Sequence, residues 1–320
     1  MDALAGAPAT RPAPRPTTRE RPPLQRLGQF CRTPKGTVLL VLVGLLLAAM
    51  VGTTRHTLPD VLAAVGGAVA VELAVGRGRG RPWAFPSGAI LSGLFVALVL
   101  ARATPPYVPL LTGALAVGLK HALRTRWSNV FNPAALALVV TAPVLHAGQS
   151  WWGALPYAGP VGFVAVLAAG WYVAQKIHKL PLALAFLLSA LLPLTVAAFC
   201  GDAAAVAQVF RAPDINALVF CGAFMLTDPP TSPARQEDQL WFGAIAGALG
   251  AAVFLTLGAQ WFILAGLPIA NACESWRRVR ARPRGRATAS RTDGSGAGPR
   301  PASRAPTRPQ AAWEPEAAQR

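Results

Sequence analysis

Charged residues are scarce in this chain of 320 residues. They make up 13% of the sequence, against roughly a quarter in an ordinary soluble domain, and 53% of the residues are hydrophobic. The middle of the chain is the poorest in charge, because 18 of the 30 Lys and Arg residues lie in the segments 1–36 and 277–320. The formal net charge of +17 is therefore mainly a property of two Pro-rich tails.

The sequence also lacks the motifs of soluble catalytic centres. It contains no GxSxG, no Walker motif, no GxGxxG after a strand and no HExxH. Its four cysteines show no CxxC or Cys/His spacing, so they predict neither a zinc site nor a disulfide framework. We expect no metal site and no catalytic residues of the hydrolase, kinase or dehydrogenase types.

Basic charge can indicate nucleic acid or a membrane surface. Here the Lys and Arg residues lie in Pro- and Ala-rich tails and at the ends of apolar runs, where anionic lipid headgroups are the nearer partner. We therefore expect membrane lipids as partners and no nucleic acid. Both tails, 1–36 and 276–320, lack apolar periodicity and are predicted to be disordered.

Apolar runs of membrane-spanning length fill the segment 37–275. A hydrocarbon core about 30 Å thick needs roughly 17 to 25 helical residues to cross it. The fold class predicted from these runs is an all-α polytopic membrane protein with about ten transmembrane helices. The predicted spans are 37–54, 58–76, 86–103, 107–123, 134–147, 160–175, 180–200, 215–227, 240–257 and 261–275. The fifth and eighth are short, which indicates tilted or broken helices.

Loop charge predicts the orientation, because basic loops are retained in the cytoplasm. With the N-terminus inside, nine loop Lys and Arg residues face the cytoplasm and three face outward. The outward residues are Arg55, Arg102 and Arg211. We therefore expect a multi-pass protein of the plasma (inner) membrane with both termini cytoplasmic.

Two segments share an unusual signature. Gly93-Leu94-Phe95 leads to a Pro-Pro pair at 105–106, and Gly222-Ala223-Phe224 leads to a Pro-Pro pair at 229–230. In the predicted order these belong to helices three and eight, so the copies cross the membrane in opposite directions. That predicts two inverted five-helix repeats, roughly 37–148 and 159–275, as in many transporters. Chance is the alternative, since the chain has 30 prolines and 30 glycines.

Three polar clusters interrupt the apolar runs and are functional candidates, because polar groups are costly at membrane depth. The segment 127–133 could hydrogen-bond a planar heterocycle through its amides and stack on it through aromatic rings; its alternative is an Asn cap of helix five. The segment 227–233 could bind a ligand or be only a turn closed by Asp and Thr hydrogen bonds. The third is 86–88, where Gly88 permits close backbone approach. The candidate residues of the first two segments are Trp127, Asn129, Phe131, Asn132, Thr227, Asp228 and Thr231.

One carboxylate, Glu72, lies inside a predicted span near its cytoplasmic end. An acidic residue at membrane depth is a candidate ion or proton carrier. The preferred alternative is that Glu72 reaches the nearby Arg77 at the interface.

The clusters resemble a known family: the RnfD component of the Rnf-type electron transport complex and the related NqrB component of the sodium-pumping NADH:quinone reductase. The resemblance covers about 83–278. It rests on Asn-Val-Phe-Asn-Pro-Ala-Ala at 129–135 and on Thr-Asp-Pro-Pro-Thr-Ser at 227–232. Phe-Pro-Ser-Gly-Ala at 85–89 and His-Lys-Leu-Pro at 178–181 add to it. The family fold implied is ten helices in two inverted halves.

The resemblance also implies a flavin cofactor. Family members carry FMN attached to a Thr of a Ser-x-Ala-Thr motif in an outward loop after helix five, but the corresponding loop here, 146–160, has no such motif. This departure argues against covalent FMN. In the reductase relatives the two asparagines of the Asn-x-x-Asn-Pro element contact a non-covalent riboflavin, and they correspond to Asn129 and Asn132.

The function implied is that of a membrane component of an Rnf/Nqr-like electron transport complex. Such a component would hold a non-covalent flavin, riboflavin or FMN, and relay electrons to other subunits of the redox complex, with possible coupling to ion transport. The alternative is a transporter or channel for a small solute on the same scaffold, because fold alone does not decide function.

Overall fold

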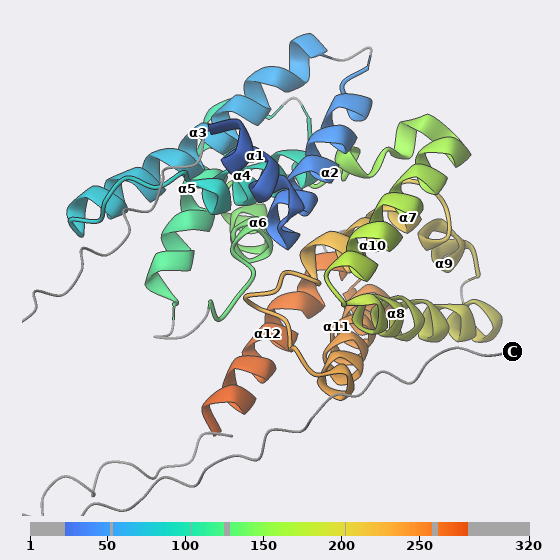
Figure 1. The fold of residues 1–320 in the computed structure, drawn as a ribbon. Helices are drawn as coiled ribbons and strands as arrows, with labels where there is room; N and C mark the ends of the chain where they lie inside the picture. Colours follow the sequence, from blue (N-terminus) through green and yellow to red (C-terminus); the bar gives the residue numbers. More distant parts are fainter. Residues whose placement is uncertain are drawn as a thin grey trace, which may run out of the picture. The chain divides into compact units, whose positions relative to one another are not determined.

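The computed structural model describes residues 23–51, 54–102, 104–124, 129–201, 203–257 and 262–280. All regular elements within these ranges are helices (Figure 1). Four of them are long and apolar enough to cross a membrane, and several shorter apolar helices accompany them. This architecture confirms the predicted all-α polytopic membrane fold.

Every predicted span corresponds to a helix. In the first half these are α2 (Pro34–Ala49), α3 (Thr54–Gly78), α4 (Ser87–Val99), α5 (Tyr107–Ala122) and α6 (Pro133–Val144). In the second half they are α7 (Gly159–Lys176), α8 (Leu180–Cys200), α10 (Asp214–Phe220) with the π-helical turn η3 (Cys221–Met225), α11 (Gln236–Leu257) and α12 (Phe262–Arg280). The fifth and eighth spans are short, as expected.

Four further elements lie between or before these helices. They are α1 (Pro23–Arg32), the 3₁₀ turns η1 (Trp152–Ala154) and η2 (Pro156–Ala158), and α9 (Ala203–Val209). The expectation that the N-terminal tail lacks structure up to residue 36 was wrong for residues 23–32. Apolar residues recur there at 24, 27, 30 and 31 along one helix face. The Phe30 ring also packs edge-on against Phe85, with centroids 6.3 Å apart.

At the other terminus, α12 continues beyond the predicted tail boundary at 276. Its last turn is fixed by ion pairs, since Glu274 contacts Arg277 at 2.9 Å and Arg278 at 2.7 Å. Pairs spaced by three and four residues stabilise a helix, which accounts for the extension to Arg280. The remaining residues of both tails lie outside the described ranges.

The two halves share one packing scheme, in which the second and fourth helices lie side by side (Figure 1). Between α3 and α5, a Cβ added at Gly67 would lie 2.2 Å from the Leu110 carbonyl oxygen. Between α8 and α11, a Cβ added at Gly243 would lie 2.4 Å from the Leu182 carbonyl oxygen. Only glycine permits such close backbone approach, the usual device for packing helices in a membrane.

The third helices support the predicted repeat and its inversion. Gly93 of α4 packs against α3, and Gly222 of η3 packs against Phe186 of α8, so each copy of the signature contacts the second helix of its own half. Gly88 at the start of α4 and Asp228 just after η3 line the same cavity. The two third helices therefore run in opposite directions.

Two ends of the helix bundle follow from these directions. The inner end is where α2, α4 and α6 begin and η3 ends, and a cavity of about 310 Å³ opens there beside a smaller one of about 90 Å³. The outer end is where α2 and α4 end and α7 begins, and a cavity of about 520 Å³ opens there. We call these the inner cavity, in two lobes, and the outer cavity.

Candidate functional site

The inner cavity brings together the three polar clusters that the sequence singled out. Its larger lobe is lined by Thr227 and Asp228, and its smaller lobe by Gly88, Asn129 and Asn132. The two lobes share five lining residues. These are Lys35, Leu91, Phe95, Asp228 and Pro230. Segments that are far apart in the chain therefore converge on one space.

Asn132 closes the start of α6. Its side-chain oxygen accepts a hydrogen bond from the Ala135 N–H at 3.1 Å, and Pro133 occupies the first helical position. The side-chain amide donates to the Met225 carbonyl at 2.8 Å, which ties α6 to the end of η3. Asn132 is thus the helix cap that the sequence offered as the alternative interpretation, and it also links the two halves.

Asn129 has a different environment. Its backbone pairs with that of Arg124, while its side chain makes no hydrogen bond within the described part of the chain and lines the smaller lobe. The neighbouring Phe131 lines a narrow crevice with Leu119 and Leu123 and does not line the inner cavity. Trp127 lies outside the described residues. Of the first cluster, therefore, Asn129 offers a free amide to the cavity.

The second cluster forms a turn centred on Asp228. The Asp228 carbonyl accepts hydrogen bonds from the Thr231 and Ser232 N–H groups at 3.1 and 3.0 Å, and its carboxylate accepts one from the Thr231 hydroxyl at 3.3 Å. The Thr227 hydroxyl donates to the Ala223 carbonyl at 2.6 Å. The alternative interpretation as a hydrogen-bonded turn therefore describes the local structure, and the turn presents the Asp228 carboxyl to the cavity.

Loss of solvent around the Asp228 carboxylate raises its pKa to about 6, although the hydrogen bond from Thr231 and the nearby lysines act in the opposite direction. A carboxyl with this pKa is partly protonated at slightly acid pH. It can then donate as well as accept a hydrogen bond in the cavity.

Three side chains that the sequence reasoning missed hold this turn in place. The fully buried Asn271 of α12 accepts from the Asn132 N–H at 2.9 Å and donates to the Thr231 carbonyl at 3.5 Å, so it joins the first two clusters. Arg278 donates to the Ser232 carbonyl at 2.8 Å. The buried Lys179 donates to the Pro233 carbonyl. A polar residue inside an apolar helix was the available signal for Asn271.

Aromatic rings form the wall of the inner cavity on its membrane side. Phe95 and Phe224 line it, and Phe220 contacts both rings at centroid distances of 6.3 and 5.0 Å. Trp151 lies behind Phe220 at 6.2 Å. All four rings are buried. They fill the space between the halves and give the cavity an apolar face on which a planar ring can pack.

Basic side chains surround the mouth of the cavity. Lys35, near the start of α2, and Lys120, near the end of α5, both line it. Glu72 of α3 forms ion pairs with Lys120 at 2.9 Å and His121 at 3.1 Å. The expectation that Glu72 reaches Arg77 was therefore wrong, because α5 packs against α3 and brings two nearer cationic groups to the carboxylate.

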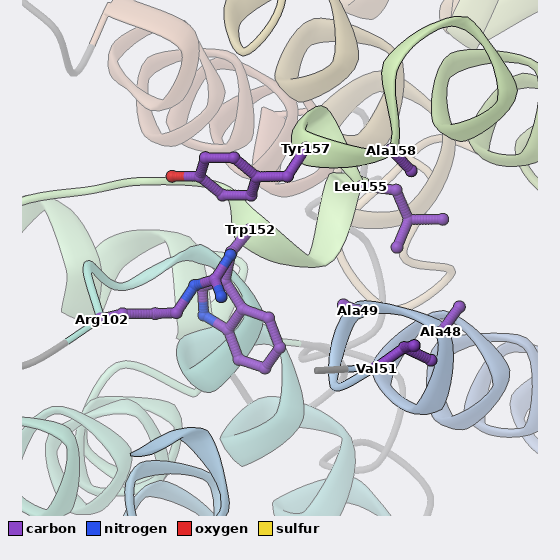
Figure 2. Close-up of a pocket in the computed structure, with 8 residues that line it drawn as sticks. All are labelled: Ala48, Ala49, Val51, Arg102, Trp152, Leu155, Tyr157 and Ala158. Atoms are coloured by element: carbon purple, nitrogen blue, oxygen red, sulfur yellow. The ribbon is translucent and has the colours of Figure 1, made fainter. Parts of the chain in front are cut away.

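The outer cavity has a separate set of side chains (Figure 2). The Arg102 guanidinium lies over the Trp152 ring, 5.4 Å from its centroid, and over the Tyr157 ring, 4.7 Å from its centroid. Cation–π contacts of this kind orient the guanidinium along the cavity wall. Trp152 is fixed in turn by a hydrogen bond to the Ala97 carbonyl at 2.7 Å.

Comparison with known proteins agrees with the resemblance seen in the sequence. A family model described as the NQR2, RnfD, RnfE family matches residues 20–155 and 146–260, which is most of the chain. The chain belongs to the NQR2, RnfD, RnfE family. The matched residues include all of the segments that form the inner cavity. The two Asn positions and the Thr-Asp-Pro-Pro turn therefore lie in the part of the chain that defines the family.

The chain is similar to a curated relative of this family, the RnfD component of the ion-translocating oxidoreductase complex of Actinobacillus pleuropneumoniae serotype 5b (strain L20). The two share 40% identity over 89 residues, which cover 25% of this chain and 25% of the relative. The match thus spans about a quarter of the relative's length. Its name places that protein in a multi-subunit oxidoreductase complex.

Proposed function

We propose that this chain is a membrane component of an Rnf/Nqr-like redox complex and that it holds a non-covalent flavin in the inner cavity. Flavin would supply the electron-carrying chemistry, and the protein would supply its binding, orientation and electrostatic surroundings. The observation that carries the proposal is the convergence of the free Asn129 amide, the Asp228 carboxyl and the Phe95 and Phe224 rings on one cavity.

The lining fits an isoalloxazine in kind. Such a ring system needs apolar faces and a few hydrogen-bonding groups along its polar edge. Phe95 and Phe224 offer the faces, while Asn129 and Asp228 offer donors and acceptors. At about 310 Å³ in its larger lobe, the cavity lies at the lower end of the range for ligand sites. Asn132 would act mainly through the positions of its neighbours, because its own amide is already bonded.

The alternative, a transporter or channel between the halves, is less well supported by the described residues. A solute path between the halves would have to connect the inner cavity with the outer one. The buried Phe220 and Trp151 rings fill the region between them. A conducting state would therefore require these rings to move.

The location proposed is the plasma membrane, with the inner end at the cytoplasm and both tails on that side. Its support is the charge of the loops, nine basic residues against three, which follows the rule for cytoplasmic loops. Other subunits of a redox complex would be the source and destination of the electrons. Membrane lipids would contact the basic tails.

An absorbance spectrum of the purified full chain tests the proposal. We expect flavin bands in a near-stoichiometric amount and no fluorescent band after denaturing electrophoresis, because the covalent attachment motif is missing. Asn129→Leu should lower the retained flavin by about tenfold or more, since an unmade buried hydrogen bond costs about 1 to 3 kcal/mol. Leu136→Ala, in the adjacent crevice, is a control that should retain flavin. Folded but colourless wild-type protein that binds no added flavin would contradict the proposal.

A further inference from the structure

Two ammonium groups meet at the start of α4. A Cβ added at Gly88 would lie 3.2 Å from Lys35 Nζ and 3.5 Å from Lys120 Nζ. The two nitrogens are therefore no farther apart than the sum of these distances. Both side chains line the smaller lobe of the inner cavity. They come from different elements, α2 and α5, so their convergence is a property of the fold and not of a local basic run.

The two lysines differ in their pairing. Lys120 is neutralised in part by Glu72 at 2.9 Å. Lys35 has no carboxylate within ion-pair distance among the described residues, and the nearest acidic group of the cavity is Asp228, which lines both lobes. Arg79 and His121, which contact each other at 3.4 Å, add further basic groups on the Glu72 side. The mouth of the cavity is thus rich in positive charge.

The helix directions add to this charge. Three helices, α2, α4 and α6, begin at the inner cavity, and the N-terminus of a helix carries a partial positive charge and free N–H groups. Side chains cap two of them, Thr33 for α2 and Asn132 for α6. The first turn of α4 has no side-chain cap, and Gly88 leaves its backbone open to close approach. Anions bind at such ends, also in broken membrane helices.

From this geometry we infer that the inner cavity contains a phosphate subsite, formed by Lys35, Lys120 and the uncapped start of α4. This inference rests on the proposed flavin site and extends it. The flavin held here would be the phosphate monoester FMN in preference to riboflavin, with its phosphate between the two ammonium groups. The ring would then extend from the smaller lobe toward Phe95 and Phe224 in the larger lobe.

Binding of FMN, riboflavin and inorganic phosphate to the purified full chain tests the inference. Flavin affinity is measured by fluorescence quenching, and phosphate binding by the shift of the unfolding temperature. We expect FMN to bind at least about tenfold more tightly than riboflavin, since a charge-assisted hydrogen bond contributes more than a neutral one. Inorganic phosphate should compete with FMN. Phosphatidylglycerol added to the micelles should compete weakly or not at all.

A charge-removing pair of variants makes the test specific. Lys35→Gln should remove the preference for FMN and the phosphate-dependent shift while leaving riboflavin affinity unchanged. Arg81→Gln removes an exposed positive charge from the loop before α4 and should leave both intact. Equal affinity of the wild type for FMN and riboflavin would overturn the phosphate subsite but leave the flavin proposal standing. If neither flavin binds, the flavin proposal fails, and the phosphate shift alone decides the subsite: a shift lost in Lys35→Gln supports it, and no shift refutes it.

Discussion

The cap at the start of α6 offers the sharpest test of how the inner cavity is held together. Asn132 makes two buried side-chain hydrogen bonds, one to the Ala135 N–H that caps the helix and one to the Met225 carbonyl in the other half. Loss of an N-cap costs about 1 kcal/mol, and an interhelical hydrogen bond in a membrane protein contributes about 0.6 kcal/mol. Asn132→Ala should therefore lower the free energy of unfolding by about 1.6 kcal/mol.

A serine at the same position separates the two contributions. Asn132→Ser keeps an N-cap acceptor but cannot reach the Met225 carbonyl, so it should cost only about 0.6 kcal/mol. Unfolding free energies are measured by titration with denaturing detergent in mixed micelles. Equal destabilisation by serine and alanine would show that the cap contributes nothing. An alanine variant as stable as the wild type would refute the whole account of Asn132.

Three further predictions follow from other parts of the structure. Because the pKa of Asp228 is raised to about 6, the folded state binds more protons than the unfolded state between about pH 4 and 6, so stability should fall as pH rises through this window; Asp228→Asn should flatten that dependence in parallel unfolding titrations, and an unchanged slope would contradict the shift. Gly67→Ala should destabilise the protein by about 1 to 3 kcal/mol, because its Cβ would meet the Leu110 carbonyl oxygen at 2.2 Å, whereas Gly66→Ala, with nothing within 4 Å, should be neutral or stabilising; equal effects would show that α3 and α5 are not in this contact. Cysteines introduced at 149 and 284 should be labelled from opposite sides of the membrane, and labelling from one side would refute the orientation.

The helices and the inverted repeat could be predicted from the sequence because they depend on local signals. Apolar runs of spanning length set the helix positions, and the two Gly-x-Phe signatures marked equivalent third helices. The cap at Asn132 was also visible, since Asn followed by Pro is a common way to begin a helix. What the sequence supplied for the site was the identity of the polar clusters, not their arrangement.

The remaining features depend on contacts between distant parts of the chain. Glu72 pairs with Lys120, 48 residues away, and no local pattern distinguishes that partner from the nearby Arg77. Lys35 was counted with a disordered tail, although α2 begins one residue before it and places it at the cavity. Phe131 was grouped with Asn129 by sequence, but the chain turns between them and directs the ring to another crevice. Tertiary packing decided all three.

A structure of the full chain with flavin bound would test the central claim most directly. The account predicts density for an isoalloxazine in the inner cavity, in contact with Phe95 or Phe224 and within hydrogen-bonding distance of the Asn129 side chain. Density for the ring only in the outer cavity beside Arg102 and Trp152, or no density in a preparation saturated with FMN and riboflavin, would contradict it.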